Sequence, residues 1–163
     1  AKANFLVAQG CMNVIEFLGG IRNGNLGRSR LGDVCARFKE GVSLLDGENG
    51  VRLLSDLMKP VDADMMWQLR CGLTHQYLPK LKTITGIFIG AGTTPGAKYD
   101  VVGEIDRDEK HVGIKGESLL MINVTALIRA IQEGRRKLIE ELKSDDTKRL
   151  RAEEALSRLP ELL

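Results

Sequence analysis

The chain has 163 residues, 43% hydrophobic and 28% charged, so it is long enough for one domain with a proper core and too short for two. Its net charge is only +2, from 24 basic and 22 acidic residues, which excludes a global attraction to polyanions. Any contact with nucleic acid would therefore be made by a local basic patch.

Three cysteines, Cys11, Cys35 and Cys71, are scattered along the chain. Their odd number and their spacing suggest neither a disulfide framework nor a zinc site, and they favour a reducing compartment. Polar residues interrupt the N-terminal apolar run, and no apolar stretch approaches the length of a membrane span, so we expect neither a signal peptide nor a membrane contact. We accordingly expect a cytoplasmic protein with no metal and no cofactor.

The first predicted element is a helix over residues 4–19, where apolar residues recur at helical spacing. Two glycines after Leu18 are expected to end it. A second stripe on the same helix is polar and consists of Gln9, Asn13 and Glu16. This polar stripe is typical of a face that is turned to solvent.

The stretch that follows is rich in glycine and asparagine and carries Arg22, Arg28 and Arg30. Three arginines in a loop are candidates for contacts with the phosphates of a nucleic acid. The alternative is a loop that is simply solvated, which is the more common case for such a composition.

Three further helices are predicted before the composition changes. One is expected over residues 33–45 with Asp33 as its N-cap, and a short one over 51–58. The third lies between Pro60 and Pro79, because a proline disfavours helical geometry at the residue before it.

From Lys82 the pattern indicates strands. Residues 82–90, 98–106, 110–116 and 118–123 are short and rich in β-branched residues, and turn residues separate them. We expect them to form a small antiparallel hairpin or meander between the helices. The glycines of "GAGTTPG" belong to a turn here and not to a phosphate-binding loop, which would have a helix after it.

Two helices complete the predicted order. A long one is expected over residues 123–143, with Asn123 as its N-cap, and a charged tail helix over 147–159. The mixed charges of the tail helix indicate a solvated helix and not a basic arm.

Arg70 and His75, at the end of the helix predicted between Pro60 and Pro79, are the strongest candidates for chemistry. An arginine suits a phosphate, and a histidine can pass a proton near neutral pH. Five positions on a helix differ by about 140° around the axis, so the two residues need a loosened turn at Gly72 or a second copy of the chain to act together. The alternative is a helix end in which the arginine pairs with an acid and the histidine caps the last carbonyls.

The stretch "MWQLRCGLTHQY" resembles the signature of the HEPN superfamily, in which an arginine, four to six residues and a histidine lie near the end of the third main helix. Arg70 and His75 match this motif with four residues between them. The stretch "NVIEFLGG" is similar to first helices of bacterial HEPN-like proteins, where an acidic residue at the place of Glu16 faces the site.

This resemblance implies a mainly α fold: an up-and-down four-helix bundle, here with the small antiparallel hairpin or meander inserted before the last long helix. Residues 1–163 would form a single HEPN-like domain, with helices one to three in 4–81 and the β insertion in 82–122.

The resemblance also implies a function. The chain would be a homodimer that binds RNA or a nucleotide, and active family members are metal-independent endoribonucleases of toxin–antitoxin and other defence systems. Arg70, His75 and Glu16 would be the catalytic residues. Some toxin members carry a tyrosine at the place of Tyr77, which a partner antitoxin protein modifies.

One residue departs from the family pattern. Catalytic members commonly have a polar residue directly after the arginine, whereas this chain has Cys71. An alternative function is therefore a dimeric protein-interaction module without catalytic activity.

Overall fold

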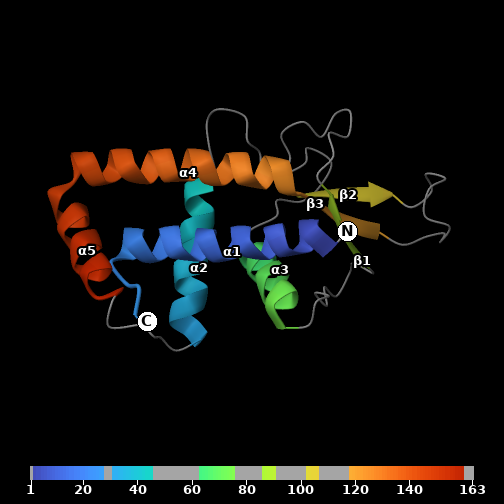
Figure 1. Ribbon diagram of the computed structural model, residues 1–163, viewed down its shortest axis with the longest axis horizontal. Helices are drawn as coiled ribbons and strands as arrows, with labels where there is room; N and C mark the ends of the chain where they lie inside the picture. Colours follow the sequence, from blue (N-terminus) through green and yellow to red (C-terminus); the bar gives the residue numbers. More distant parts are fainter. Residues whose placement is uncertain are drawn as a thin grey trace.

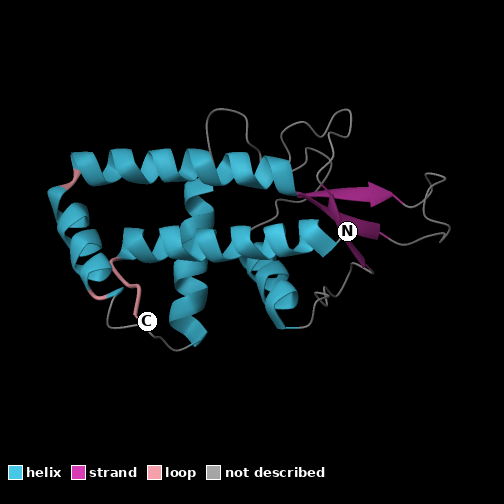
Figure 2. Cartoon of the chain, viewed as in Figure 1, coloured by secondary structure: helices cyan, strands magenta, loops and turns pink. Residues whose placement is uncertain are grey.

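Five helices and a three-stranded sheet make up the part of the chain that the structure describes (Figures 1 and 2). It is a computed structural model, and it describes residues 2–27, 31–45, 63–75, 86–90, 102–106 and 118–159. The elements are α1 (Lys2–Asn23), α2 (Leu31–Leu45), α3 (Ala63–His75), β1 (Gly86–Gly90), β2 (Val102–Asp106), β3 (Ser118–Asn123), α4 (Val124–Ser144) and α5 (Asp146–Ser157). The helix predicted over 51–58 and the strand predicted over 110–116 lie outside the described residues.

Helix α1 continues past the two glycines that were expected to end it. It ends instead at Asn23, because Gly24 adopts the left-handed conformation at φ 67°. The amide of Gly24 donates to the carbonyl of Ile21, and the amide of Asn25 donates to the carbonyl of Gly20. These two bonds satisfy the last carbonyls of the helix, so the predicted boundary at residue 19 is wrong by one turn.

Gly19 lies where α1 crosses α2. A Cβ atom at Gly19 would sit 1.8 Å from the carbonyl oxygen of Arg37, and one at Gly41 of α2 would sit 1.9 Å from the carbonyl oxygen of Ile15. The two helix backbones are therefore in direct contact at this point. Gly19, which was expected to help end the helix, instead allows α1 and α2 to approach so closely, together with Gly41.

The core is formed by side chains from the first four helices, and the predicted apolar stripe of α1 lies in it. The largest fully buried side chains are Phe38, Met12, Ile15, Leu44, Leu45, Met66, Leu69, Leu73 and Leu127. Trp67 of α3 packs against this core with its ring centroid 5.8 Å from that of Phe38.

The predicted up-and-down four-helix bundle is wrong. Helices α1 and α4 both begin near the sheet and end near α5, so they run in the same direction, and α2 crosses them steeply (Figure 1). In an up-and-down bundle each helix would instead run antiparallel to the one before it. The apolar stripes indicated which faces are buried, but the close contact of α1 with α2 sets the crossing angle.

The predicted antiparallel hairpin or meander is also wrong. The three strands form a mixed sheet in the order β1-β3-β2, in which β1 pairs with β3 in parallel and β2 pairs with β3 antiparallel. A meander would place β2 between its two chain neighbours. Residue composition indicated strands, but the choice of neighbours depends on long-range contacts, among them the contact of β1 with α1.

Helix α5 turns back from the end of α4 and packs against α1 (Figure 1). Its N-cap is Asp145, whose side chain accepts from the amide of Lys148. Ala152 and Ala155 are its buried residues.

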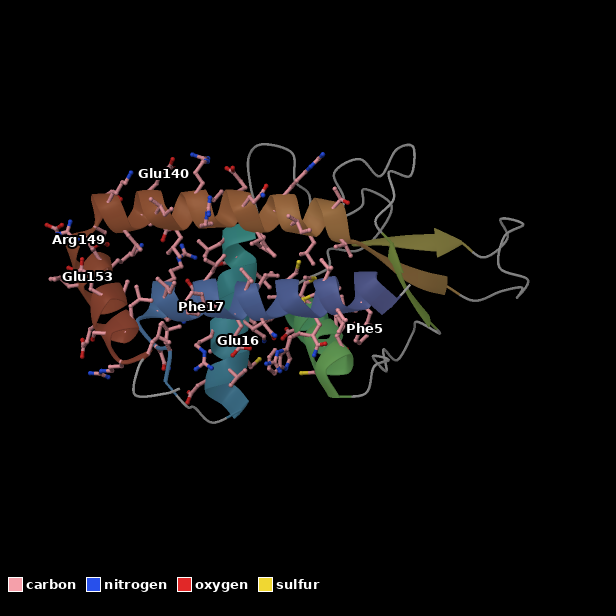
Figure 3. All side chains as sticks on the ribbon, in the orientation of Figure 1. Phe5, Glu16, Phe17, Glu140, Arg149 and Glu153 are labelled. Atoms are coloured by element: carbon pink, nitrogen blue, oxygen red, sulfur yellow. The ribbon has the colours of Figure 1, made fainter. Side chains whose placement is uncertain are left out.

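Glu140 lies on the face of α4 that is turned away from α1 (Figure 3). Among the described residues, no helix is long and apolar enough to cross a membrane.

Candidate functional site

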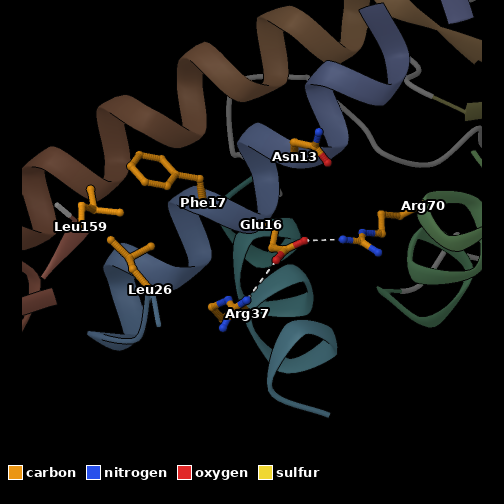
Figure 4. A pocket seen from close by; sticks show the side chains of 7 residues that line it. All are labelled: Asn13, Glu16, Phe17, Leu26, Arg37, Arg70 and Leu159. Carbon is orange, nitrogen blue, oxygen red and sulfur yellow. Dashed lines mark hydrogen bonds and ion pairs between the residues drawn. The ribbon is translucent and has the colours of Figure 1, made fainter. Parts of the chain in front are cut away.

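A pocket of about 310 Å³ opens where α1, α2 and α3 meet the end of α5 (Figure 4). Its lining residues are Asn13, Glu16, Phe17, Leu26, Arg37, Arg70 and Leu159. They come from five segments: α1, the loop after it, α2, α3 and the residues that follow α5. The pocket has a charged end around Glu16 and an apolar end around Phe17 (Figure 4).

Glu16 holds two arginines from two different helices. One carboxylate oxygen accepts from Nη2 of Arg70 at 2.7 Å, and the other accepts from Nη2 of Arg37 at 3.1 Å. All three side chains are largely buried, with exposed fractions of 17% for Glu16, 12% for Arg70 and 10% for Arg37. Two guanidinium groups face one carboxylate, so this cluster carries one positive charge in excess.

Arg70 is fixed from two sides. Its guanidinium carbon lies 5.2 Å from the centroid of the Trp67 ring, one helical turn earlier on α3. Its Nε is buried and has no hydrogen-bond partner among the described residues. A stacked and ion-paired arginine loses little further freedom when it binds an anion, which favours anion recognition at this position.

Cys71, the residue that departs from the family pattern, follows Arg70 on α3. Burial raises the pKa of its thiol, and the nearby Arg70 guanidinium partly opposes this by lowering it. The thiol is therefore protonated at neutral pH and is not an activated nucleophile.

Helix α3 is regular through His75, so the loosened turn at Gly72 does not occur. Positions 70 and 75 consequently lie about 140° apart around the helix axis. The side chain of His75 lies outside the described part of the structure, as do Tyr77, Arg28 and Arg30.

Arg22, the third arginine proposed for nucleic-acid contacts, takes part in an internal network. Its Nε and Nη2 donate to the two carboxylate oxygens of Glu141 at 2.9 and 2.7 Å. Its Nη1 donates to Ser43 at 2.8 Å and lies 3.0 Å from Glu40. These contacts tie the end of α1 to α2 and α4.

Arg37 is a residue of the candidate site that the sequence analysis missed. The residue is buried, and its Nη1 also donates to the carbonyl oxygen of Gly27 at 3.3 Å. The sequence held one clue to this role. Arg37 stands directly before Phe38, and Phe38 and Val42 belong to the apolar stripe of α2. A charged residue beside a buried stripe needs a polar partner. That partner is Glu16, which belongs to the polar stripe of α1 that the sequence analysis interpreted as a solvated face.

Comparison of the chain with known protein families, with curated proteins and with solved structures gave no match.

Proposed function

We propose that this chain binds RNA, as the resemblance of its Arg70 and His75 motif implies, with a phosphate of the RNA held at the charged end of the pocket. The observation that carries this proposal is the pair of arginines on one carboxylate, Arg37 and Arg70 on Glu16. The excess positive charge of this cluster favours an anion at the open side of the pocket.

Arg70 is the phosphate-binding group in this proposal. A guanidinium has five N–H donors in a planar fork, and the bond to Glu16 engages Nη2 alone. A phosphate offers acceptors that match this fork. Arg37 is bonded to both Glu16 and Gly27, so its role is to supply charge and to position Glu16.

The proposed reaction is metal-independent cleavage of the RNA backbone. His75 accepts the proton of a ribose 2′-hydroxyl or donates one to the leaving 5′-oxygen, while the 2′-oxygen forms the new bond to phosphorus. Arg70 stabilises the negative charge that develops on the phosphoryl oxygens. Since α3 is regular, Arg70 of one chain would act with the histidine of a second copy in a homodimer.

RNA cleavage in EDTA tests this proposal. We expect wild type to cleave single-stranded RNA, and Arg70→Ala and His75→Ala to lose the activity. Arg136→Ala is the matched control, because Arg136 is half-exposed on α4 and pairs only with its helix neighbours Glu133 and Glu140 among the described residues. Equal cleavage by wild type, Arg70→Ala and His75→Ala would refute a catalytic role.

Mixing the two inactive variants tests whether the site is shared. If each site takes Arg70 from one chain and His75 from the other, mixed dimers hold one intact site, and roughly a quarter of the wild-type activity returns. No recovery after exchange of subunits would contradict a site shared between chains.

The second candidate function is a dimeric interaction module without catalytic activity. The observation in its favour is a row of exposed apolar side chains on α1, namely Leu6, Val7 and Val14, beside the departure at Cys71. A stable dimer in sedimentation analysis, together with no RNA binding or cleavage, would select this function over the first.

A further inference from the structure

The apolar end of the pocket is formed by residues from both ends of the described chain. Phe17 comes from α1, Leu26 from the loop that follows it, and Leu159 from the residues that follow α5. Figure 4 shows the three side chains on one side of the pocket, with Arg70 on the other side and Glu16 and Arg37 between them. Phe17 is 42% exposed, whereas Phe38 is completely buried in the core.

A single exposed phenylalanine is ordinary on a protein surface. Here the phenylalanine is joined by two leucines in a concave site that also holds a charged cluster. Such a site takes a ligand with an anionic part and an apolar part.

The charged end and the apolar end of the pocket lie close together. Asn13, Glu16 and Phe17 stand at positions i, i+3 and i+4 of α1, so they share one face of that helix. Phe17 directly follows the residue that holds both arginines. The anionic and apolar parts of the ligand must therefore be separated by a small spacer.

We propose that the apolar end, formed by Phe17, Leu26 and Leu159, binds the base of the nucleotide whose phosphate lies at Arg70. This inference rests on the proposed function and names the part of the RNA that the pocket recognises. In RNA a ribose joins a phosphate to a flat base, and aromatic side chains bind unpaired bases by stacking. A volume of about 310 Å³ is at the lower limit for small-molecule sites and suits one nucleotide unit.

In this geometry the contacts of the base at the apolar end add affinity separately from the contacts of the phosphate at Arg70. Stacking on an aromatic ring tolerates every base, because each base has a π-face. We therefore expect single-stranded RNA to bind here and a paired duplex to bind poorly, since its bases are stacked on one another.

Fluorescence anisotropy with two oligomers tests the base site. One is a short single-stranded 2′-O-methyl RNA, which cannot be cleaved through the 2′-oxygen, and the other is an abasic oligomer of equal length and backbone. We expect wild type to bind the oligomer with bases about tenfold more tightly. Phe17→Ala and Leu159→Ala should remove this difference, whereas Arg70→Met should weaken the binding of both oligomers.

The matched controls are Val14→Ala on α1 and Leu156→Ala on α5, two exposed apolar residues outside the pocket lining. Both should retain the tenfold preference. Equal binding of the two oligomers by wild type, or an equal loss for both in Phe17→Ala and Leu159→Ala, would overturn the base site while leaving phosphate binding in place. If wild type binds neither oligomer, the proposed function and the base site both fail.

Discussion

The Glu16 carboxylate bonds Arg70 at 2.7 Å across 54 residues of sequence, and so joins α1 to α3 at the mouth of the pocket. The same carboxylate holds Arg37 of α2. One acidic residue therefore sets the position of both arginines. Its loss would remove the negative charge that these two largely buried guanidinium groups share.

Glu16→Gln should lower the stability of the protein. The amide keeps the shape of the side chain but removes the charge that both arginines need, and we expect the free energy of unfolding to fall by about 2 kcal/mol. Urea denaturation followed by circular dichroism measures this change. Glu140→Gln is the matched control, because Glu140 is exposed and pairs with Arg136 one turn away, and it should cost less than about 0.5 kcal/mol. Equal losses in the two variants would contradict the role of Glu16.

Gly19→Ala and Gly41→Ala should each disrupt the crossing of α1 and α2. The added methyl groups would overlap backbone oxygens at 1.8 and 1.9 Å, and a backbone cannot yield as a flexible side chain does. We expect a loss of about 3 kcal/mol or more in each case. Thermal unfolding checks this expectation.

Gly10→Ala provides the control for this experiment. Gly10 is exposed within α1, and nothing among the described residues lies within 4 Å of the position of its Cβ. Alanine has the higher helix propensity, so this variant should gain about 0.5–1 kcal/mol. A gain from Gly19→Ala as well would show that the two helices are not in contact there.

Arg22 and Glu141 should be energetically coupled and should not contribute to RNA binding. Their bidentate bond joins α1 to α4 and is about three-quarters buried, so a double-mutant cycle with Arg22→Met and Glu141→Gln should give a coupling energy of about 1 kcal/mol. Arg22→Met should leave the affinity for RNA unchanged. A coupling energy near zero, or a loss of RNA affinity comparable with that of Arg70→Met, would contradict this assignment.

The Cys71 thiol should react slowly with alkylating reagents at neutral pH. Burial raises its pKa, so the reactive thiolate forms only at more alkaline pH than in a free cysteine. Since the folded-state pKa is raised, this group also removes stability as the pH rises above the ordinary thiol range. Peptide mapping after alkylation at a series of pH values gives the midpoint for Cys71.

Arg70→Met tests the influence of the neighbouring guanidinium on the pKa of Cys71. The guanidinium lowers the pKa of Cys71, so its removal should move the midpoint to still higher pH. A midpoint at or below that of free cysteine in the wild-type protein would contradict the burial of this thiol.

The sequence predicted where the helices lie better than how they pack. Apolar spacing located α1, α3 and α4, but the end of α1 at Asn23 and the N-cap of α5 at Asp145 were not predicted. The crossing at Gly19 and Gly41 could not be read from local patterns, because it depends on two glycines from different helices meeting. The pairing of β1 with β3 is non-local for the same reason.

The candidate site was only partly predictable. Arg70 and Glu16 were found through a short motif and its resemblance, whereas Arg37 and Leu159 reach the pocket from segments that are distant from Glu16 in the sequence. A buried arginine beside Phe38 was the one local clue. Periodicity reveals which face is buried, but it does not reveal which charged residues meet there.

The claim that an RNA phosphate binds at Arg70 is tested most directly by the side-chain N–H resonances of Arg70 in a ¹⁵N-labelled protein. Arg70→Lys identifies these resonances by their loss, and Arg136, which is half-exposed on α4, serves as the internal reference. During titration with uncleavable single-stranded RNA, we predict that the Arg70 resonances shift and saturate while those of Arg136 stay in place. Saturable RNA binding with unchanged Arg70 resonances would contradict the account.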